Sequence, residues 1–345
     1  MSHESCTFPA RIGLVDAIVL DNGFVRVAAV PELGGKIISL IRVESGCEYL
    51  LQPSNPERAW RPPSFGDKFE DWEPCGFDEC MPTVAECLYT EAPFSGSRLP
   101  DHGDVWRLPS SVEVSGDQIS LTTTLRSLPL RFTKKLRLRE STVRLDYEAI
   151  NTSESTVKFL WSAHPLLRVE PGTEIILPED VKEVEVGWSK DQRLGQGGDR
   201  CTWPNALDSS RRTVEINKVV SPETGRAEKL FTSRLSQGTC GVFQRQQNES
   251  IVFRFDTNLV PYVGIWICQG GWPASQPYKQ FTVALEPCLG CPDSLAESIK
   301  RDECATLEAG ATMQWWLEVE VNGGAPRFSA DVDTYRTPMK EARKA

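Results

Sequence analysis

Several features that define common protein classes are missing from this sequence. No segment approaches 18 consecutive apolar residues, which excludes a membrane-spanning helix. Basic residues are in the minority, with 38 Lys and Arg against 48 Asp and Glu, and a formal charge of -10 does not suit a nucleic-acid partner. Glycine-rich phosphate loops are also absent, which argues against NAD and ATP as cofactors.

An export signal is missing as well. The first 20 residues have no basic region ahead of an apolar stretch, and Asp16 interrupts the apolar residues that follow. The remaining composition, 40% hydrophobic and 25% charged, is that of an ordinary globular protein. We therefore expect a soluble, cytoplasmic protein that does not bind membranes, present as a monomer or homodimer.

Cysteine is abundant, yet its spacing fits no common metal site. The count of 11 is odd, and in a chain without an export signal this favours reduced thiols. Cys288 and Cys291 form a CxxC pair without a second pair at ribbon spacing. We expect buried cysteines and no metal. A Cys/His zinc hydrolase is kept as an alternative, which stoichiometric zinc in the purified protein would support.

Alternation of apolar and polar residues is the main structural signal. In residues 143–150, Val143, Leu145 and Tyr147 fall on one face and the charged residues between them fall on the other. The same pattern recurs at 119–125, 136–138, 251–255 and 315–321. Short polar breaks between such segments are typical of hairpins. The sequence predicts an all-β, antiparallel protein.

Helical periodicity is nearly absent. One short helix is predicted at Asp293 to Lys300, with Asp293 as its cap. Residues 52–109 are rich in Pro, Gly, aromatic and acidic residues, and we expect them to form long functional loops across one sheet. Residues 195–208 are expected to form a second loop of this kind.

Histidine is scarce, and its positions restrict the possible chemistry. Of the three histidines, His3 lies near the N-terminus, where fraying is common. His102 lies in the turn-like segment LPDHGDVW, and His164 ends the apolar segment KFLWSAHPLL. Taken alone, His164 fits a buried structural histidine better than a functional one.

Glu286 is the most conspicuous carboxylate. It ends the apolar run Phe281 to Leu285, where burying a charge costs several kcal/mol unless the charge is paired. An imidazole and a carboxylate that face each other across a pocket can donate and accept protons near neutral pH. A salt bridge to a surface Lys or Arg is the structural alternative.

Four segments together resemble the galactose mutarotase-like superfamily, which includes the aldose 1-epimerases. They are VPELGGKIISL (30–40), PDHGDVW (100–106), WSAHPLL (161–167) and ALEPCLGCPDSLA (284–296), and they occur in the same order as in that superfamily. The resemblance covers about residues 25–300. It implies a large twisted antiparallel β-sandwich with very few short helices, as a single domain with a core at about 12–322 and a C-terminal tail at about 323–345. A sugar-binding cleft would lie on the concave face.

The resemblance also implies an activity. Such enzymes interconvert the α and β anomers of a free monosaccharide through its open-chain form, without a metal or organic cofactor. By similarity, Glu286 matches the general base at the C1 hydroxyl, and His164 matches the general acid at the ring oxygen. His102 matches a second histidine that hydrogen-bonds the sugar. We expect His164 to be protonated near neutral pH, stabilised by a nearby carboxylate.

Substrate specificity does not transfer from the galactose enzymes. Residues 76–87, GFDECMPTVAEC, replace the Gly-Arg and Ala-Asn-Arg-Ile segments of that branch. Asp78 and Glu79 are candidates for binding sugar hydroxyls, with solvated loop charges as the alternative. Trp266, in YVGIWICQGG, is a candidate for packing against the sugar ring.

The charge of the sugar is a separate question. His102 is followed by Gly-Asp-Val-Trp and not by the motif of the sugar-phosphate branch, which favours a neutral or weakly charged sugar. Arg58, Arg61 and Arg98 flank the loop region and could bind an anionic substituent, although surface solvation explains them equally well. A non-catalytic carbohydrate-binding or regulatory protein is the alternative function, since it would need the aromatic residues but not an acid and a base.

Overall fold

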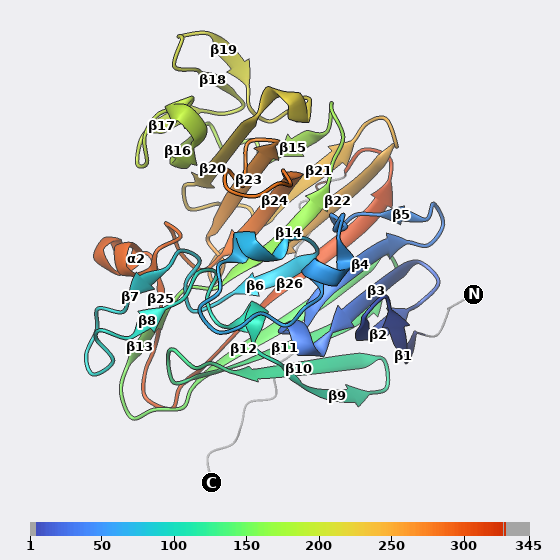
Figure 1. Ribbon diagram of the computed structural model, residues 1–345, viewed down its shortest axis with the longest axis vertical. Coiled ribbons are helices and arrows are strands. Elements are labelled where there is room, and N and C mark those ends of the chain that lie inside the picture. The colour runs from blue at the N-terminus through green and yellow to red at the C-terminus, as the bar shows by residue number, and fades with distance from the viewer. Residues whose placement is uncertain (1–4, 327, 329–345) are drawn as a thin grey trace.

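Two large antiparallel sheets make up most of the computed structural model, which describes residues 5–326 and 328 (Figure 1). The first sheet has 12 strands, with β5 (Cys47–Glu48) paired to β4 off the main path. The others follow the order β1 (Cys6–Ile12), β2 (Val15–Asp21), β3 (Val25–Val30), β4 (Lys36–Arg42), β6 (Phe77–Cys80), β14 (Ser162–Arg168), β24 (Phe281–Cys288), β23 (Tyr262–Gln269), β20 (Arg226–Thr232), β16 (Glu183–Ser189) and β17 (Arg200–Thr202).

The second sheet has eight strands. Their order is β15 (Glu174–Ile176), β21 (Thr239–Gln244), β22 (Glu249–Phe255), β26 (Thr312–Gly323), β12 (Thr142–Asn151), β11 (Leu130–Arg139), β10 (Gln118–Thr124) and β9 (Ser111–Ser115). Three small two-stranded sheets pair β13 (Val157–Phe159) with β25 (Ala305–Leu307), β18 (Asn205–Leu207) with β19 (Thr213–Glu215), and β7 (Cys87–Leu88) with β8 (Arg98–Leu99). The predicted all-β antiparallel fold is confirmed.

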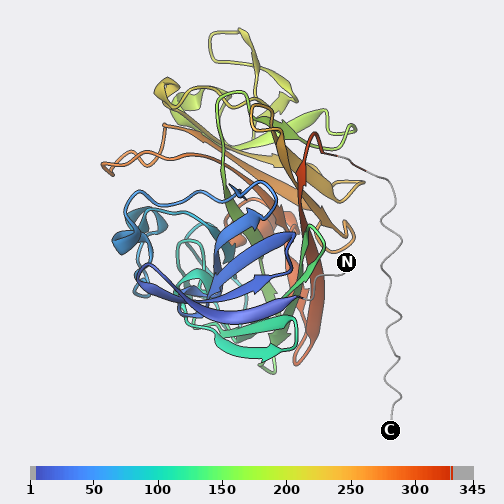
Figure 2. The same cartoon turned by 90° about the vertical axis from the view of Figure 1, so that its right-hand side faces the viewer.

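The predicted alternation determines how the two sheets pack. Along β12, Val143, Leu145 and Tyr147 are buried, and the residues between them are partly exposed. One continuous apolar cluster contains Leu40 from the first sheet and Leu145 from the second. The N-terminal strands β1–β3 lie next to β9 and β10 in both views (Figures 1 and 2). Burial of one face of each sheet against the other therefore forms the core.

The loop region at 52–109 contains only short elements. These are α1 (Pro56–Ala59), the 3-10 turns η2 (Phe69–Trp72) and η3 (Val105–Arg107), and the strands β6, β7 and β8. Strand β6 inserts between β4 and β14 in the first sheet and was not predicted from the sequence. All four residues of β6 are buried, so the strand shows no alternation of polar and apolar residues. The other predicted loop, 195–208, includes β17 and β18.

The predicted short helix is present as α2 (Leu295–Arg301). Its N-cap residue is Ser294, so the prediction that Asp293 caps it was wrong. The side chain of Asp293 instead lies 3.4 Å from the ammonium of Lys229. Neither α-helix in the described residues has the length and apolar character that crossing a bilayer demands.

The other 3-10 turns lie in connections between strands, and the cysteines are free thiols. The 3-10 turns η1 (Pro31–Leu33) and η4 (Lys190–Gln192) connect strands of the first sheet, and η5 (Pro222–Thr224) lies between β19 and β20. All eleven cysteines lie in the described part of the chain as free thiols, and most are buried. Within residues 5–326 and 328, no three His, Cys, Asp or Glu side chains are grouped as a metal ion requires. His3 lies outside the described residues.

Candidate functional site

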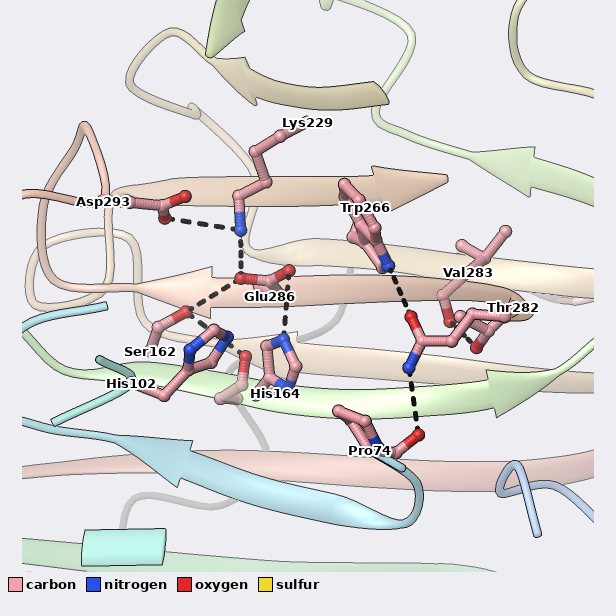
Figure 3. A network of polar contacts seen from close by, with 12 residues as sticks. Pro74, His102, Ser162, His164, Lys229, Trp266, Thr282, Val283, Glu286 and Asp293 are labelled. Carbon is pink, nitrogen blue, oxygen red and sulfur yellow. Dashed lines mark hydrogen bonds and ion pairs between the residues drawn. The ribbon is translucent and has the colours of Figure 1, made fainter. Parts of the chain in front are cut away.

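A cavity of about 390 Å³ opens over the middle of the first sheet. Its lining includes His102, His164 and Glu286, which are far apart in the sequence, together with Trp266. The structure thus brings four of the predicted site residues to one cavity. Figure 3 shows the side chains of His102, His164 and Glu286 close together, with a dashed line that joins His164 to Glu286.

Strand register explains why His164 and Glu286 meet. In the pairing of β14 with β24, Leu166 lies opposite Ala284 and Ser162 lies opposite Cys288, which places His164 opposite Glu286. Directly opposed residues in antiparallel strands project to the same face of the sheet. Nε2 of His164 lies 3.9 Å from Oε1 of Glu286, close enough for an ion pair but too far for a direct hydrogen bond.

His164 is buried, and its pKa is lowered well below 6.5. Burial is the main cause, and the positive charges of His102, Lys229 and Lys36 add to it. The imidazole is therefore neutral near pH 7, and the expectation of a protonated His164 was wrong. Its Nδ1 is a buried atom without a side-chain hydrogen-bond partner among the described residues, whereas Nε2 is the nitrogen that lies near Glu286.

Lys229 is the direct partner of Glu286. Its Nζ lies 2.5 Å from Oε2 of Glu286 and 3.4 Å from Oδ1 of Asp293 (Figure 3). Burial raises the pKa of Glu286, and the ammonium of Lys229 opposes that rise. Burial lowers the pKa of Lys229, but Asp293 and Glu286 outweigh it and raise that pKa overall. Lys229 is therefore an ammonium ion at neutral pH.

Gly264 leaves the space that this ion pair needs. It lies opposite Glu286 in the pairing of β23 with β24. A Cβ atom at this position would lie 3.3 Å from Oε2 of Glu286 and 3.3 Å from Nζ of Lys229. Any larger residue would therefore crowd both charged groups.

His102 is held from two sides. Its Nδ1 lies 2.9 Å from Oδ1 of Asp101, and its ring stacks on Phe69 with centroids 3.9 Å apart. Burial opposes ionisation of Asp101, but the charge and hydrogen bond of His102 prevail and lower the pKa of Asp101 to about 2. The rings of His102 and His164 are nearly perpendicular, in a T-shaped contact with centroids 5.2 Å apart. Asp101 thus orients His102 toward His164.

Tryptophans form the other end of the cavity. Trp266 donates a hydrogen bond from Nε1 to Oε1 of Gln280 at 3.3 Å, and Gln280 in turn donates to the carbonyl of Pro74 (Figure 3). Trp188 is near-parallel to Trp266, with centroids 6.0 Å apart, and Trp272 meets Trp266 edge-on at 5.7 Å. The cavity therefore has a charged end and an aromatic end.

No protein-family model matches the sequence, and no curated protein matches it. Solved structures do match the fold. A galactose mutarotase related enzyme from Lactobacillus acidophilus superposes with a TM-score of 0.64 over 89% of this chain and 97% of that chain, at 16% identity. A galactose mutarotase-like protein from Clostridium acetobutylicum gives a TM-score of 0.62 over 93% of this chain and 99% of that one, at 12% identity. The chain has the galactose mutarotase-like fold.

The predicted fold is thus confirmed. A third match is the Slr1438 protein from Synechocystis sp. PCC 6803, with a TM-score of 0.66 at 16% identity over 93% of this chain and 97% of that chain. At these low sequence identities, a shared galactose mutarotase-like fold does not show that corresponding residues have the same roles.

Within this galactose mutarotase-like fold, Asp78 and Glu79 lie outside the cavity lining. Asp78 pairs with Lys36 at 3.0 Å, and Glu79 pairs with Lys134 at 2.7 Å. Glu79 also accepts a hydrogen bond from the hydroxyl of Tyr147. Both carboxylates are buried, so they are not solvated loop charges either. This corrects the prediction that they bind sugar hydroxyls, because each is already neutralised inside the protein.

The three candidate arginines also lie outside the lining. Arg58 donates to Oε1 of Gln276 and to the carbonyl of Asp71, and Arg98 pairs with Glu86 on the surface. Arg61 is exposed. In the part of the chain that the structure describes, the cavity of this galactose mutarotase-like fold is lined by no arginine.

Sequence reasoning missed Lys229, Asp101 and Trp188. Lys229 and its neighbour Glu228 are two adjacent charges between the apolar residues Ala227 and Leu230 of strand β20, which was the available signal. Asp101 directly precedes His102 in the predicted turn. Trp188 follows Gly187 in β16, and nothing in the local pattern indicated which face it occupies.

Proposed function

We propose that this protein is an aldose 1-epimerase-like mutarotase that interconverts the α and β anomers of a free sugar. The observation that supports this most is the 3.9 Å approach of Nε2 of His164 to Oε1 of Glu286 on the wall of a cavity that also holds tryptophans. A proton donor and a proton acceptor beside an aromatic surface are what ring opening requires.

The proposed chemistry assigns one proton transfer to each group. Glu286 as carboxylate accepts the proton of the C1 hydroxyl while the bond between C1 and the ring oxygen breaks. His164 delivers a proton to the ring oxygen from its imidazolium form, which is the minority form near pH 7 because burial lowers the pKa of the side chain, and an open-chain aldehyde results. Rotation about the C1–C2 bond followed by the reverse transfers gives the other anomer. His102, fixed by Asp101, is suited to hydrogen-bond the sugar near the reacting oxygen.

Lys229 has a specific part in this scheme. Its ammonium, 2.5 Å from Glu286, favours the carboxylate form of a buried side chain that would otherwise become protonated. Apart from the two histidines, the charged residues of the lining are the carboxylates Asp101, Glu286 and Asp293 and the ammonium of Lys229. That excess of negative charge favours a neutral sugar over an anionic one.

The test is anomeric-exchange NMR on a panel of free aldoses. We expect the protein to accelerate exchange of at least one neutral aldose well above the spontaneous rate. Glu286→Gln should lower the rate on the order of 10² to 10⁴ and leave sugar binding nearly intact. Exchange at the spontaneous rate for every aldose would contradict the proposal.

A non-catalytic carbohydrate-binding protein is the second candidate. It is favoured by the ion pair with Lys229, because a carboxylate held by an ammonium ion is a weaker base than a free one. In that case saturation-transfer NMR would detect sugar binding, while anomeric exchange would stay at the spontaneous rate. Glu286→Gln would not change that exchange rate.

A further inference from the structure

Trp188 lies at the aromatic end of the cavity and has no part in the proposed proton transfers. It lines the cavity together with Trp266, yet its exposed fraction is 43%. By comparison, Trp161 and Trp315 are almost fully buried in the core. A large aromatic face left open to solvent inside a cavity is typical of a ligand surface.

A β-bulge turns Trp188 toward the cavity. In β16, Val184 and Val186 are buried and pair with Thr232 and Leu230 of β20. Regular alternation would send residue 188 to the same face as these valines. The register shifts between Val186 and Trp188, so that Trp188 pairs with Lys229, whose side chain lines the cavity. Bulges commonly redirect a side chain in this way beside functional sites.

Gly187 makes the bulge compatible with the packing around it. A Cβ atom at this position would lie 2.7 Å from Cε2 of Phe231. Phe231 is buried and also lines the cavity. The glycine therefore allows the strand to bend around Phe231 while Trp188 stays exposed.

Strand order gives the separation between Trp188 and the charged end. Moving across the sheet from β24, which carries Glu286, to β16, which carries Trp188, crosses β23 and β20. Three steps of about 4.8 Å between neighbouring strands separate the two backbones by roughly 14 Å. Side chains from both backbones extend into the cavity, and Trp266, on the intervening strand β23, has its ring 6.0 Å from that of Trp188. A sugar ring held at Glu286 beside Trp266 therefore leaves the indole of Trp188 for a second, linked ring.

We propose that Trp188 forms a second sugar-ring subsite, so that the cavity prefers a reducing disaccharide to a monosaccharide. The reducing ring would lie against Glu286 and His164, and the second ring would pack its C–H face on the indole of Trp188. The orientation of the ligand rests on the proposed mutarotase function. The subsite itself rests on the bulge, the exposure and the strand order described above.

The experiment compares binding of monosaccharides with that of their reducing disaccharides. Titration calorimetry with D-glucose, maltose and cellobiose, and with D-galactose and galactobiose, measures the preference of the wild-type protein. We expect at least one disaccharide to bind about tenfold more tightly than its reducing monosaccharide. Trp188→Ala should remove most of that preference, and Trp188→Phe should retain part of it.

Trp316→Ala is the matched control. Trp316 is a partly buried tryptophan on β26 of the other sheet, where it packs on the guanidinium of Arg144. This variant should keep the wild-type ratio of disaccharide to monosaccharide affinity. The proposal is overturned if no disaccharide binds more tightly than its monosaccharide, or if Trp188→Ala weakens both by the same factor.

Exchange NMR on the same sugars separates the two proposals. Exchange of monosaccharides without any preference for a disaccharide would overturn the subsite and support the mutarotase. Selective binding of a disaccharide that depends on Trp188, with exchange at the spontaneous rate, would support the subsite and overturn the mutarotase.

Discussion

Lys229 places its ammonium 2.5 Å from the carboxylate of Glu286, inside the cavity and 57 residues away in the sequence. A charge on Glu286 is otherwise disfavoured, because the side chain is almost fully buried. The ion pair therefore determines which protonation state of Glu286 a sugar would meet.

Replacing Lys229 should change the pH dependence of the reaction. In Lys229→Met, Glu286 loses its positive partner, and its pKa should rise further above its ordinary value. The acidic limb of kcat/KM should move to higher pH by the same amount, and Lys229→Arg should restore part of the shift. Measurement of kcat/KM from pH 4 to 9 checks this.

Lys300→Met is the control for that experiment. Lys300 lies on the surface of α2 and pairs with Glu297 at 2.6 Å. Its removal should leave both limbs of the profile in place. An unmoved acidic limb in Lys229→Met, with the fold intact by circular dichroism, would show that Lys229 does not act through Glu286.

The wild-type pH profile should peak on the acidic side of neutrality. The pKa of His164 lies well below 6.5, so most of its imidazole has already lost the proton when the pH reaches 6.5. Glu286 has a pKa above 4.5, so it gains a proton as the pH falls. The form with protonated His164 and ionised Glu286 therefore declines from pH 6.5 upward. A kcat/KM that stays constant or increases between pH 6.5 and 9, after subtraction of the spontaneous rate, would contradict these assignments.

The buried ion pair of Lys134 and Glu79 should matter for stability. Lys134→Met leaves the Glu79 carboxylate buried without its cation, which should lower the free energy of unfolding by about 3 to 5 kcal/mol. The double variant Lys134→Met, Glu79→Gln should recover much of this loss, because no unpaired charge remains. Urea denaturation measures all three proteins. A loss below about 1 kcal/mol, as expected for the exposed pair of Lys300 and Glu297, would be inconsistent with a buried charge.

Much of the fold could be predicted because its signal is local. Alternation along β12 depends only on which residues face the core, so Val143, Leu145 and Tyr147 predict the strand without knowledge of its partners. Strand β6 could not be found in this way, since a strand buried on both faces does not alternate. The same strand carries Asp78 and Glu79, which is why their charges looked like those of a loop.

Part of the candidate site could be predicted because histidine is scarce in this sequence. With three histidines in the chain, His102 and His164 were the only candidates away from the N-terminus, and Glu286 was conspicuous at the end of an apolar run. Their protonation states were not predictable, because these depend on burial and on the distance to Lys229.

The amino-acid sequence by itself determined the antiparallel β architecture and the residue types available for proton transfer, since both follow from local composition and pattern. Only the tertiary structure decided that Lys229 neutralises Glu286, that Asp78 and Glu79 pair inside the protein, and that Trp188 faces the cavity. The physical reason is that these features depend on strand register, and register is set by pairing between segments that are distant in the chain.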